Sequence, residues 1–493
     1  MTFYISKIHS LMGRRVVDRS QYLWIVLSVA FASFISGLNI YIVNISLPAL
    51  SRYFGVSTSI VSRIALVYLL AGTSTLLFFG KLGDRFGLKK ILVLGYFFFT
   101  GGSLLCAISW NIDILILFRF MQGLGGAMLT AASFAIIPKF LPKEITGWAF
   151  GIVATGTALG IMIGAPLGGI IIDFLSWRWL FLIKVPVGIV AIFIALKVLP
   201  GEKITNSSTK ENKQGFNILS TLLSFLGLFL FIYALNMGQE YGWASYHIIS
   251  IFVLSLILLL LFTIAEKVSK VSLLDYQLFK NVYFFYAILS AFCYRVFLGG
   301  NGFILPFYLE TVKGMGPVKI GLLFTLYGLA FIVVGYTAGR FSDKVSPSLP
   351  CAMSMFSASV CSLVFAYTLQ FPGTGFVYVL LIWLGVSSGL FIIPNYNQVM
   401  QLAHPGKQGI ASGIFQTINI VGTVIGVTLF ETIFSEVIPH EFTSLTQYIT
   451  SKGLSIHDLF PGFCYVYIFG GVVCLMGLLC YMMILITQKR YKT

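Results

Sequence analysis

Long apolar runs separated by short polar stretches dominate this chain. The runs are rich in Leu, Ile, Phe and Gly and recur from about residue 22 to about residue 487. Because a transmembrane helix needs roughly 20 mostly apolar residues, each run predicts one membrane-spanning helix. A transmembrane barrel would need segments of about ten residues with alternating polarity, and these runs are continuous. We therefore expect an all-α integral membrane protein.

The apolar runs predict fourteen spans, and an even number places both termini on the same side of the membrane. No polar stretch between them is long enough to form a separate catalytic domain, so any function must reside in the helical bundle. The expected centres lie near residues 35, 69, 100, 125, 160, 189, 227, 257, 296, 328, 359, 388, 422 and 474.

The basic residues determine the expected orientation. The 32 Lys and Arg exceed the 16 Asp and Glu, giving a net charge of +16, which could suggest nucleic acid as a partner. Most of the basic residues, however, lie in alternate loops, near 85, 141, 207, 274, 342 and 405, and few, such as Arg52, lie on the other side. Cytoplasmic loops show this enrichment. The pattern predicts a multi-pass protein of the inner (plasma) membrane with cytoplasmic termini, surrounded by lipid, with no nucleic-acid partner; we expect a monomer.

Sequence signals for enzyme chemistry are missing. The seven cysteines form no CxxC pair, and the five histidines lie near predicted loops or span ends. No GxxxxGK[ST], HExxH or GxSxG motif occurs in the chain. We expect no metal, no cofactor and no enzymatic activity.

Two predicted inner loops resemble each other. GKLGDRFGLKK at 80–90 and GRFSDK at 339–344 each follow a span and each carry an acid among basic residues. Repeated loops suggest repeated halves, which in transporters move against each other around a central site. Glycines permit close packing, and an acid can accept N–H groups at a helix N-terminus, so we interpret the loops as conformational latches. An ordinary basic loop is the alternative, but it does not explain the acid. The latch residues are Gly80, Gly83, Asp84, Arg85, Gly87 and Asp343.

Five segments together resemble one protein family. The loop at 80–90, LFRFMQGLGGA at 117–127 and GTALGIMIGAPLGG at 156–169 resemble motifs of the major facilitator superfamily, and LNIYIVNISLP at 38–48 and WRWLFLIKVPVG at 177–188 resemble its fourteen-helix drug:H+ antiporter branch. The resemblance implies two six-helix halves with two additional helices. The expected parts are a cytoplasmic tail 1–21, an N-terminal bundle 22–199, a linker 200–216, two additional spans 217–266, a cytoplasmic loop 267–282, a C-terminal bundle 283–487 and a tail 488–493.

The resemblance also assigns roles to particular residues. It makes Arg119 a buried arginine of the fourth helix, for which pure packing is the alternative to a transport role. It implies that the fifth helix is kinked and closely packed through Gly160, Gly164, Pro166, Gly168 and Gly169.

Asn39 departs from the family pattern, because the branch commonly carries a proton-coupling Asp there. Since Asn cannot exchange a proton near neutral pH, another group must couple transport if protons drive it. The proton-coupling candidates are Glu310, Glu431 and Arg119; an ordinary helical pair between Glu310 and Lys313 is the alternative for the first.

Four basic residues, Arg63, Arg119, Lys184 and Arg295, lie within predicted spans. Intramembrane charges usually face the bundle interior or a wet cavity, although Arg63 and Lys184 are near enough to span ends to extend to the interface. Buried amides also need partners inside the bundle. The expected substrate-cavity residues are Asn39, Tyr41, Asn44, Arg63, Gln122, Lys184, Arg295, Asn301, Asn395 and Asn397.

These features predict a secondary active transporter that exports amphipathic small molecules in exchange for protons by alternating access. The intramembrane bases favour anionic or zwitterionic substrates over lipophilic cations. An uncoupled facilitator or a lipid-translocating transporter of the same fold is the alternative, and a sensor or scaffold without a transport cycle is a more distant one.

Overall fold

The computed structural model describes residues 19–199, 218–268, 276–344, 346–371, 373–403, 408–437 and 459–490. Residues 1–18 of the predicted tail 1–21, the linker 200–216 and most of the outer loop 437–460 lie outside these residues, and the helix α2 already begins at Arg19. The described residues contain fourteen helices of at least 15 residues, and every predicted span centre falls within one of them. The predicted all-helical membrane fold is confirmed.

The helices follow one another with short connections. The N-terminal group, called here the N half, comprises α2 (Arg19–Phe54), α3 (Thr58–Phe86), α4 (Leu88–Ala107), α5 (Ile112–Phe140), α6 (Lys143–Phe174), α7 (Trp179–Leu182) and α8 (Lys184–Val198). The two middle helices are α9 (Ile218–Tyr241) and α10 (Tyr246–Val268). The C half comprises α11 (Tyr276–Lys280), α12 (Val282–Phe307), the π-helical turn η2 (Tyr308–Val312), α13 (Pro317–Lys344), α14 (Ser348–Thr368), α15 (Gly375–Leu402), α16 (Gln408–Val437) and α18 (Phe460–Arg490).

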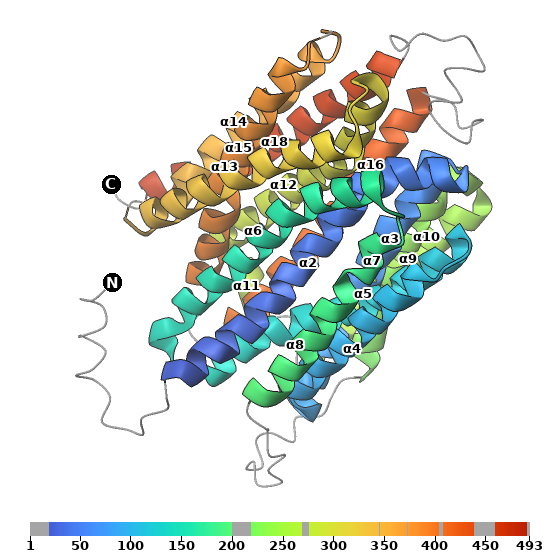
Figure 1. Ribbon diagram of the computed structural model, residues 1–493. Coiled ribbons are helices and arrows are strands. Elements are labelled where there is room, and N and C mark those ends of the chain that lie inside the picture. The colour runs from blue at the N-terminus through green and yellow to red at the C-terminus, as the bar shows by residue number, and fades with distance from the viewer. Residues whose placement is uncertain are drawn as a thin grey trace.

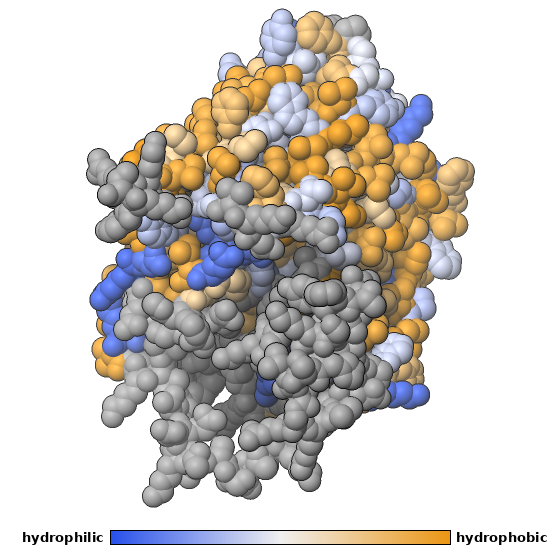
Figure 2. All heavy atoms as spheres, turned by 90° about the vertical axis from the view of Figure 1, so that its left-hand side faces the viewer, coloured by the Kyte–Doolittle hydropathy of each residue, from blue (hydrophilic) through white to orange (hydrophobic). Residues whose placement is uncertain are grey.

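Twelve of these helices are long and apolar enough to cross a membrane. Two shorter apolar segments, Ile60–Leu76 and Leu222–Leu235, lie within α3 and α9. The first residue of α2 and the last of α18 lie on the same side of the bundle (Figure 1). Apolar side chains cover much of the surface coloured in Figure 2, as a lipid-facing surface requires.

The helices pack as two groups joined along a seam. In the N half, α2 packs on α6 and α5 packs on α3 and α4, whereas in the C half α12 packs on α16, α13 on α15 and α14 on α18. The two groups occupy opposite sides of Figure 1 and meet where α6 contacts α13 and α3 contacts α16. The middle pair lies at the edge, with α9 against α3 and α10 against α9.

Polar side chains and glycines determine where several helices begin and end. Ser57 and Asn111 accept backbone N–H bonds at the starts of α3 and α5, as helix N-caps do. Gly87, with φ of 100°, separates α3 from α4. The segment 80–90, which we expected to be a loop, is therefore helical through Phe86, and Asp84 lies in the last turn of α3 rather than at a helix N-terminus within that loop.

A row of glycines on α6 packs directly on α2. Gly156, Gly160, Gly164 and Gly168 recur every four residues, and a Cβ on any of them would approach a carbonyl oxygen of α2 closer than 3.0 Å. The four carbonyls belong to Ala30, Phe34, Leu38 and Ile42, which share the same spacing. Small residues at this period let two membrane helices approach closely, since van der Waals packing supplies much of their association.

This packing predicts different outcomes for two Gly→Ala substitutions. Gly160→Ala should lower the melting temperature of the detergent-solubilised protein by several degrees, because overpacking typically costs about 1–3 kcal/mol. Gly72→Ala is the matched control, since a Cβ there would have no heavy atom within 4 Å. The melting temperature of Gly72→Ala should equal that of the wild type or exceed it slightly, because Ala has a higher helix propensity than Gly. Equal melting temperatures for both variants would contradict the close α2–α6 contact.

Candidate functional site

Arg119 lies at the centre of the N half. Its side chain is 1% exposed, and its Nε donates to the carbonyl oxygen of Ile64 on α3 at 2.8 Å. One terminal nitrogen donates to Gln122 Oε1 and to Asn39 Oδ1, the latter at 3.2 Å. The guanidinium also lies 4.5 Å from the centre of the Tyr68 ring, a cation–π arrangement. Arg119 therefore connects three helices through one side chain.

A second cation reaches the same amide from α8. Lys184, at the first position of α8, is 2% exposed, and its Nζ donates to Asn39 Oδ1 at 2.6 Å. The ammonium lies 4.6 Å from the centre of the Phe181 ring on α7. Lys184 thus points into the bundle, and our alternative that it extends to the membrane interface is wrong. We call Arg119, Lys184 and Asn39 the central basic cluster.

The central basic cluster is electrostatically unbalanced. The two cationic nitrogens lie at most about 6 Å apart, since their distances to Asn39 Oδ1 are 3.2 and 2.6 Å. Two unit charges at that separation repel by about 3 kcal/mol at an effective dielectric constant of 20. Within the described part of the chain neither cation forms an ion pair. The neutral oxygen of Asn39 is therefore the acceptor that the two cations share.

A second polar cluster lies where the halves meet. Tyr41 of the N half and Tyr327 of the C half form a hydroxyl–hydroxyl contact, and Arg295 on α12 is near enough to both for electrostatic interaction. Arg295 is partly buried, and its Nε donates to Asn419 Oδ1 on α16 at 3.2 Å. We call Tyr41, Tyr327 and Arg295 the junction cluster.

The end of the bundle predicted to face outside, called the outer end, is closed by contacts between the halves. Arg52 of α2 forms an ion pair with Glu310 of η2, in which the side chains are 48% and 11% exposed. The Glu310–Lys313 helical pair, our alternative for Glu310, does not form; Lys313 Nζ donates to the carbonyl oxygen of Phe371 instead. Burial lowers the pKa of Lys313.

Two more contacts join the halves at the outer end. Asp173 at the end of α6 accepts a hydrogen bond from the backbone N–H of Val318, 3.2 Å away, in the first turn of α13. Glu431 on α16 is buried and interacts electrostatically with Arg63 on α3. Both predicted acids, Glu310 and Glu431, thus face basic residues of the other half.

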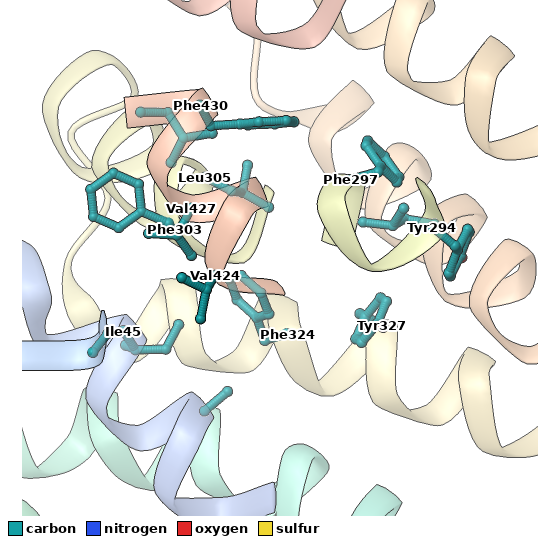
Figure 3. Close-up of a cluster of buried hydrophobic side chains, with 14 of the residues drawn as sticks. Ile45, Tyr294, Phe297, Phe303, Leu305, Phe324, Tyr327, Val424, Val427 and Phe430 are labelled. Atoms are coloured by element: carbon teal, nitrogen blue, oxygen red, sulfur yellow. The ribbon is translucent and has the colours of Figure 1, made fainter. Parts of the chain in front are cut away.

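Close backbone packing accompanies these charges. Gly169 of α6 lies against Pro317 of α13, and Gly321 of α13 lies against Ala165 of α6. Figure 3 shows Ile45 of α2 beside an apolar group of the C half that includes Phe303, Phe324 and Val424. Glycine packing and apolar side chains therefore bring the two halves into direct contact at these positions.

The remaining predicted residues lie in several environments. Gln122 is buried and donates to Ser103, and Asn395 donates to the Ala287 carbonyl and to the Tyr481 hydroxyl, so both connect helices within one half. Asn395 is 0% exposed, and the structure places it in the packed core of the C half rather than in a cavity. Asn301 is buried, whereas Asn44 and Asn397 are partly exposed.

The predicted latches are described only in part. The backbone places Asp343 in the last turn of α13, matching the position of Asp84 at the end of α3. Their side chains and that of Arg85 lie outside the described features, so the latch stays a prediction.

Several contributing residues were absent from the sequence-based site. Arg52 was expected in an outer loop, but α2 continues to Phe54 and carries it to Glu310. Asn419 holds Arg295, and Ser103 holds Gln122. An apolar helix containing one amide or hydroxyl gives no indication of its partner in sequence, because the partners lie on other helices.

Comparisons with known proteins agree with this architecture. A family model described as Major Facilitator Superfamily matches residues 29–427. A riboflavin transporter of Clostridioides difficile (strain 630) is 32% identical over 416 residues, covering 84% of this chain and 88% of the relative. A probable multidrug resistance protein of Escherichia coli (strain K12) is 30% identical over 357 residues, covering 71% and 69%.

Solved structures share the fold at low sequence identity. A bacterial homologue of the human lysosomal transporter Spinster aligns with a TM-score of 0.63 at 13% identity, covering 94% of this chain and 97% of that one. A D-xylose–proton symporter aligns with a TM-score of 0.62 at 11% identity, covering 92% and 97%. The family model, the relatives and the two-half architecture agree: the chain belongs to the Major Facilitator Superfamily, and its multidrug-resistance relatives fit the drug:H+ antiporter branch.

Proposed function

We propose that this membrane transporter exports amphipathic small molecules in exchange for protons, with a preference for anionic or zwitterionic substrates. The proposed substrate class rests on the junction cluster. Arg295 forms no ion pair within the described residues, and it interacts electrostatically with tyrosines of both halves. A cation beside aromatic rings suits a ligand that has an anionic group and an apolar body.

Alternating access is supported by how the halves meet. The outer end joins the halves through a partly exposed ion pair, one hydrogen bond at a helix terminus and the glycine-mediated packing of α6 on α13. A seam of this kind can separate while each half stays intact. The junction cluster lies between the halves, at the position expected for a substrate site in a transporter with repeated halves.

Glu310 and Glu431 are the proposed proton-sensing groups of the outer end. Each carboxylate faces a basic residue of the other half, so protonation removes one attraction across the seam. Protons arriving from outside would then favour opening toward that side. Arg119 was also a proton-coupling candidate from the sequence, and in this proposal it contributes a fixed positive charge in the centre of the N half.

An uncoupled facilitator is the second candidate. It is favoured by Asn39, because the central basic cluster offers an amide where a titrating carboxylate would supply coupling. Dependence of transport on an imposed pH gradient in proteoliposomes separates the two functions.

Substrate charge provides the first test of the proposal. Proteoliposomes containing the protein should transport taurocholate, an anion, and norfloxacin, a zwitterion, faster than ethidium, a cation. Riboflavin is also measured, because one relative is described as a riboflavin transporter. Arg295→Met should reduce taurocholate transport by about tenfold or more while changing ethidium transport little, since one buried charge-assisted contact contributes about 1.5–3 kcal/mol. Lys319→Met, at an exposed lysine of α13, is the control. Faster transport of ethidium by the unmodified protein would exclude the anionic preference.

The outer acids provide a second test. Glu310→Gln and Glu431→Gln imitate the protonated carboxyl groups and should raise labelling of an outer-seam cysteine, introduced at Val318, by a thiol reagent added from outside. Glu310→Gln removes the ion pair with Arg52, and Glu431→Gln removes the electrostatic interaction with Arg63, so each variant is expected to increase labelling. Substrate-driven proton flux is measured in parallel. If both variants keep wild-type labelling and wild-type flux, neither acid senses the proton.

A further inference from the structure

The central basic cluster contains two buried cations and one neutral acceptor, and this imbalance requires an explanation. A charge removed from water is costly unless an opposite charge or several hydrogen bonds compensate it. Arg119 has such compensation, because three oxygens accept its N–H groups. Lys184 has one oxygen, Asn39 Oδ1, and it shares that oxygen with Arg119. Lys184 is therefore the less stabilised cation.

Among the described residues, no acidic side chain interacts with Lys184 to hold the ammonium. α8 packs against α2, α4 and α7, and none of these four helices contains Asp or Glu. The titratable neighbours are Arg119 on α5 and the Cys106 thiol on α4, with Tyr68 of α3 against Arg119. Arg119 cannot relieve the repulsion by losing its proton, since guanidinium stays protonated in proteins. A lysine can become neutral when it is buried.

We propose that Lys184 is the group that binds and releases the transported proton. This inference rests on the proposed proton-coupled function and adds a site to it: the lone pair of the Nζ amine takes one proton from water to form the ammonium and returns one proton to water. No other bond changes. Asn39 Oδ1 can accept an N–H bond from either form, so Asn39 positions Lys184 in both states.

The geometry also gives the exchange a direction. In the state described here the outer end is closed and Lys184 is 2% exposed, which favours the neutral amine beside Arg119. If the halves separate at the outer end and water reaches the cluster, hydration favours the ammonium. Opening thus binds a proton from outside, and closing of the outer end favours its release to water on the inner side. Glu310 and Glu431 act at the seam, whereas Lys184 holds the proton within the N half.

The first experiment needs no substrate. Melting temperatures of the full-length protein in detergent are measured between pH 6.5 and 9 for the wild type and for Lys184→Met. Unfolding exposes Lys184 and lets it bind a proton, so at this side chain the unfolded state binds one more proton than the folded state, and Lys184 contributes a rise of stability with pH. One such proton changes the unfolding equilibrium constant tenfold per pH unit. Lys184→Met should lose this part of the slope and melt at a higher temperature near pH 6.5. Lys197→Met, at an exposed lysine of the same helix, should keep it.

A second variant keeps the test decisive if Lys184→Met folds poorly. Asn39→Asp places a carboxylate between the two cations, so Lys184 should remain an ammonium, and the slope should again disappear while stability near pH 7 increases. Wild-type slopes in both variants would overturn the proposal. A chloride effect would also overturn the proposal. If the wild-type melting temperature depends on chloride at constant ionic strength, and Lys184→Met removes this dependence, a bound anion balances the second charge.

Proton flux separates the proton site from a merely structural cation. Lys184→Arg keeps a positive charge that cannot release its proton, so substrate-driven proton flux in proteoliposomes, with norfloxacin as the probe, should fall at least tenfold. A structural role would leave the flux near wild type, and that result would refute the inference. If the wild type itself shows no flux, the proposed coupling fails, but the pH dependence of melting still tests whether Lys184 exchanges a proton.

Discussion

Every polar group inside a bilayer must find its partner within the protein, because the hydrocarbon offers none. This constraint organises the molecule. The hydroxyls of Ser354, Ser359 and Ser362 on α14 donate to carbonyl oxygens of α15 and α18 and thereby bind the C half together. Where every buried polar group has its hydrogen-bond partners, the helices are fixed to one another. Where they are incomplete, as at Lys184 and Asn39, the protein retains a group whose state depends on whether water can enter.

The apolar pattern predicted most of the architecture. All fourteen expected span centres fall within helices, because a run long enough to cross a membrane has few alternatives to helix. Helix ends were predicted less well. The charged segment around Asp84 was expected to be a loop, yet α3 extends to Phe86, since charged residues can continue a helix beyond the hydrocarbon until a glycine such as Gly87 ends it. Arg52 was misplaced for the same reason.

The site was predicted as a collection of residue types, and the pairings came only with the structure. Sequence identified Asn39, Arg119 and Lys184 separately, but they are far apart in the chain and meet on one amide oxygen. Asn395 was predicted to line the cavity because it is polar and lies deep in a span. These properties fit a hydrogen-bonded bridge between packed helices equally well, and the structure shows Asn395 in such a bridge. Depth in the membrane can be predicted from the position along a span, whereas the direction of a side chain depends on which helices surround it.

Neighbouring glycines on α6 show how one helix can serve a fixed contact and a separable one. Gly168 faces Ile42 within the N half, and Gly169, the next residue, faces Pro317 of the C half. On the first side four glycines, spaced four residues apart, pack along α2, so separation would break the whole helix pair. On the second side the packing is supplemented by a partly exposed ion pair, and such pairs contribute about 1 kcal/mol or less. If the seam between the halves opens, as alternating access requires, the close contact between α2 and α6 would make these two helices move together. That motion would carry Asn39, and with it the amide shared by the two cations, between a dry and a wet environment.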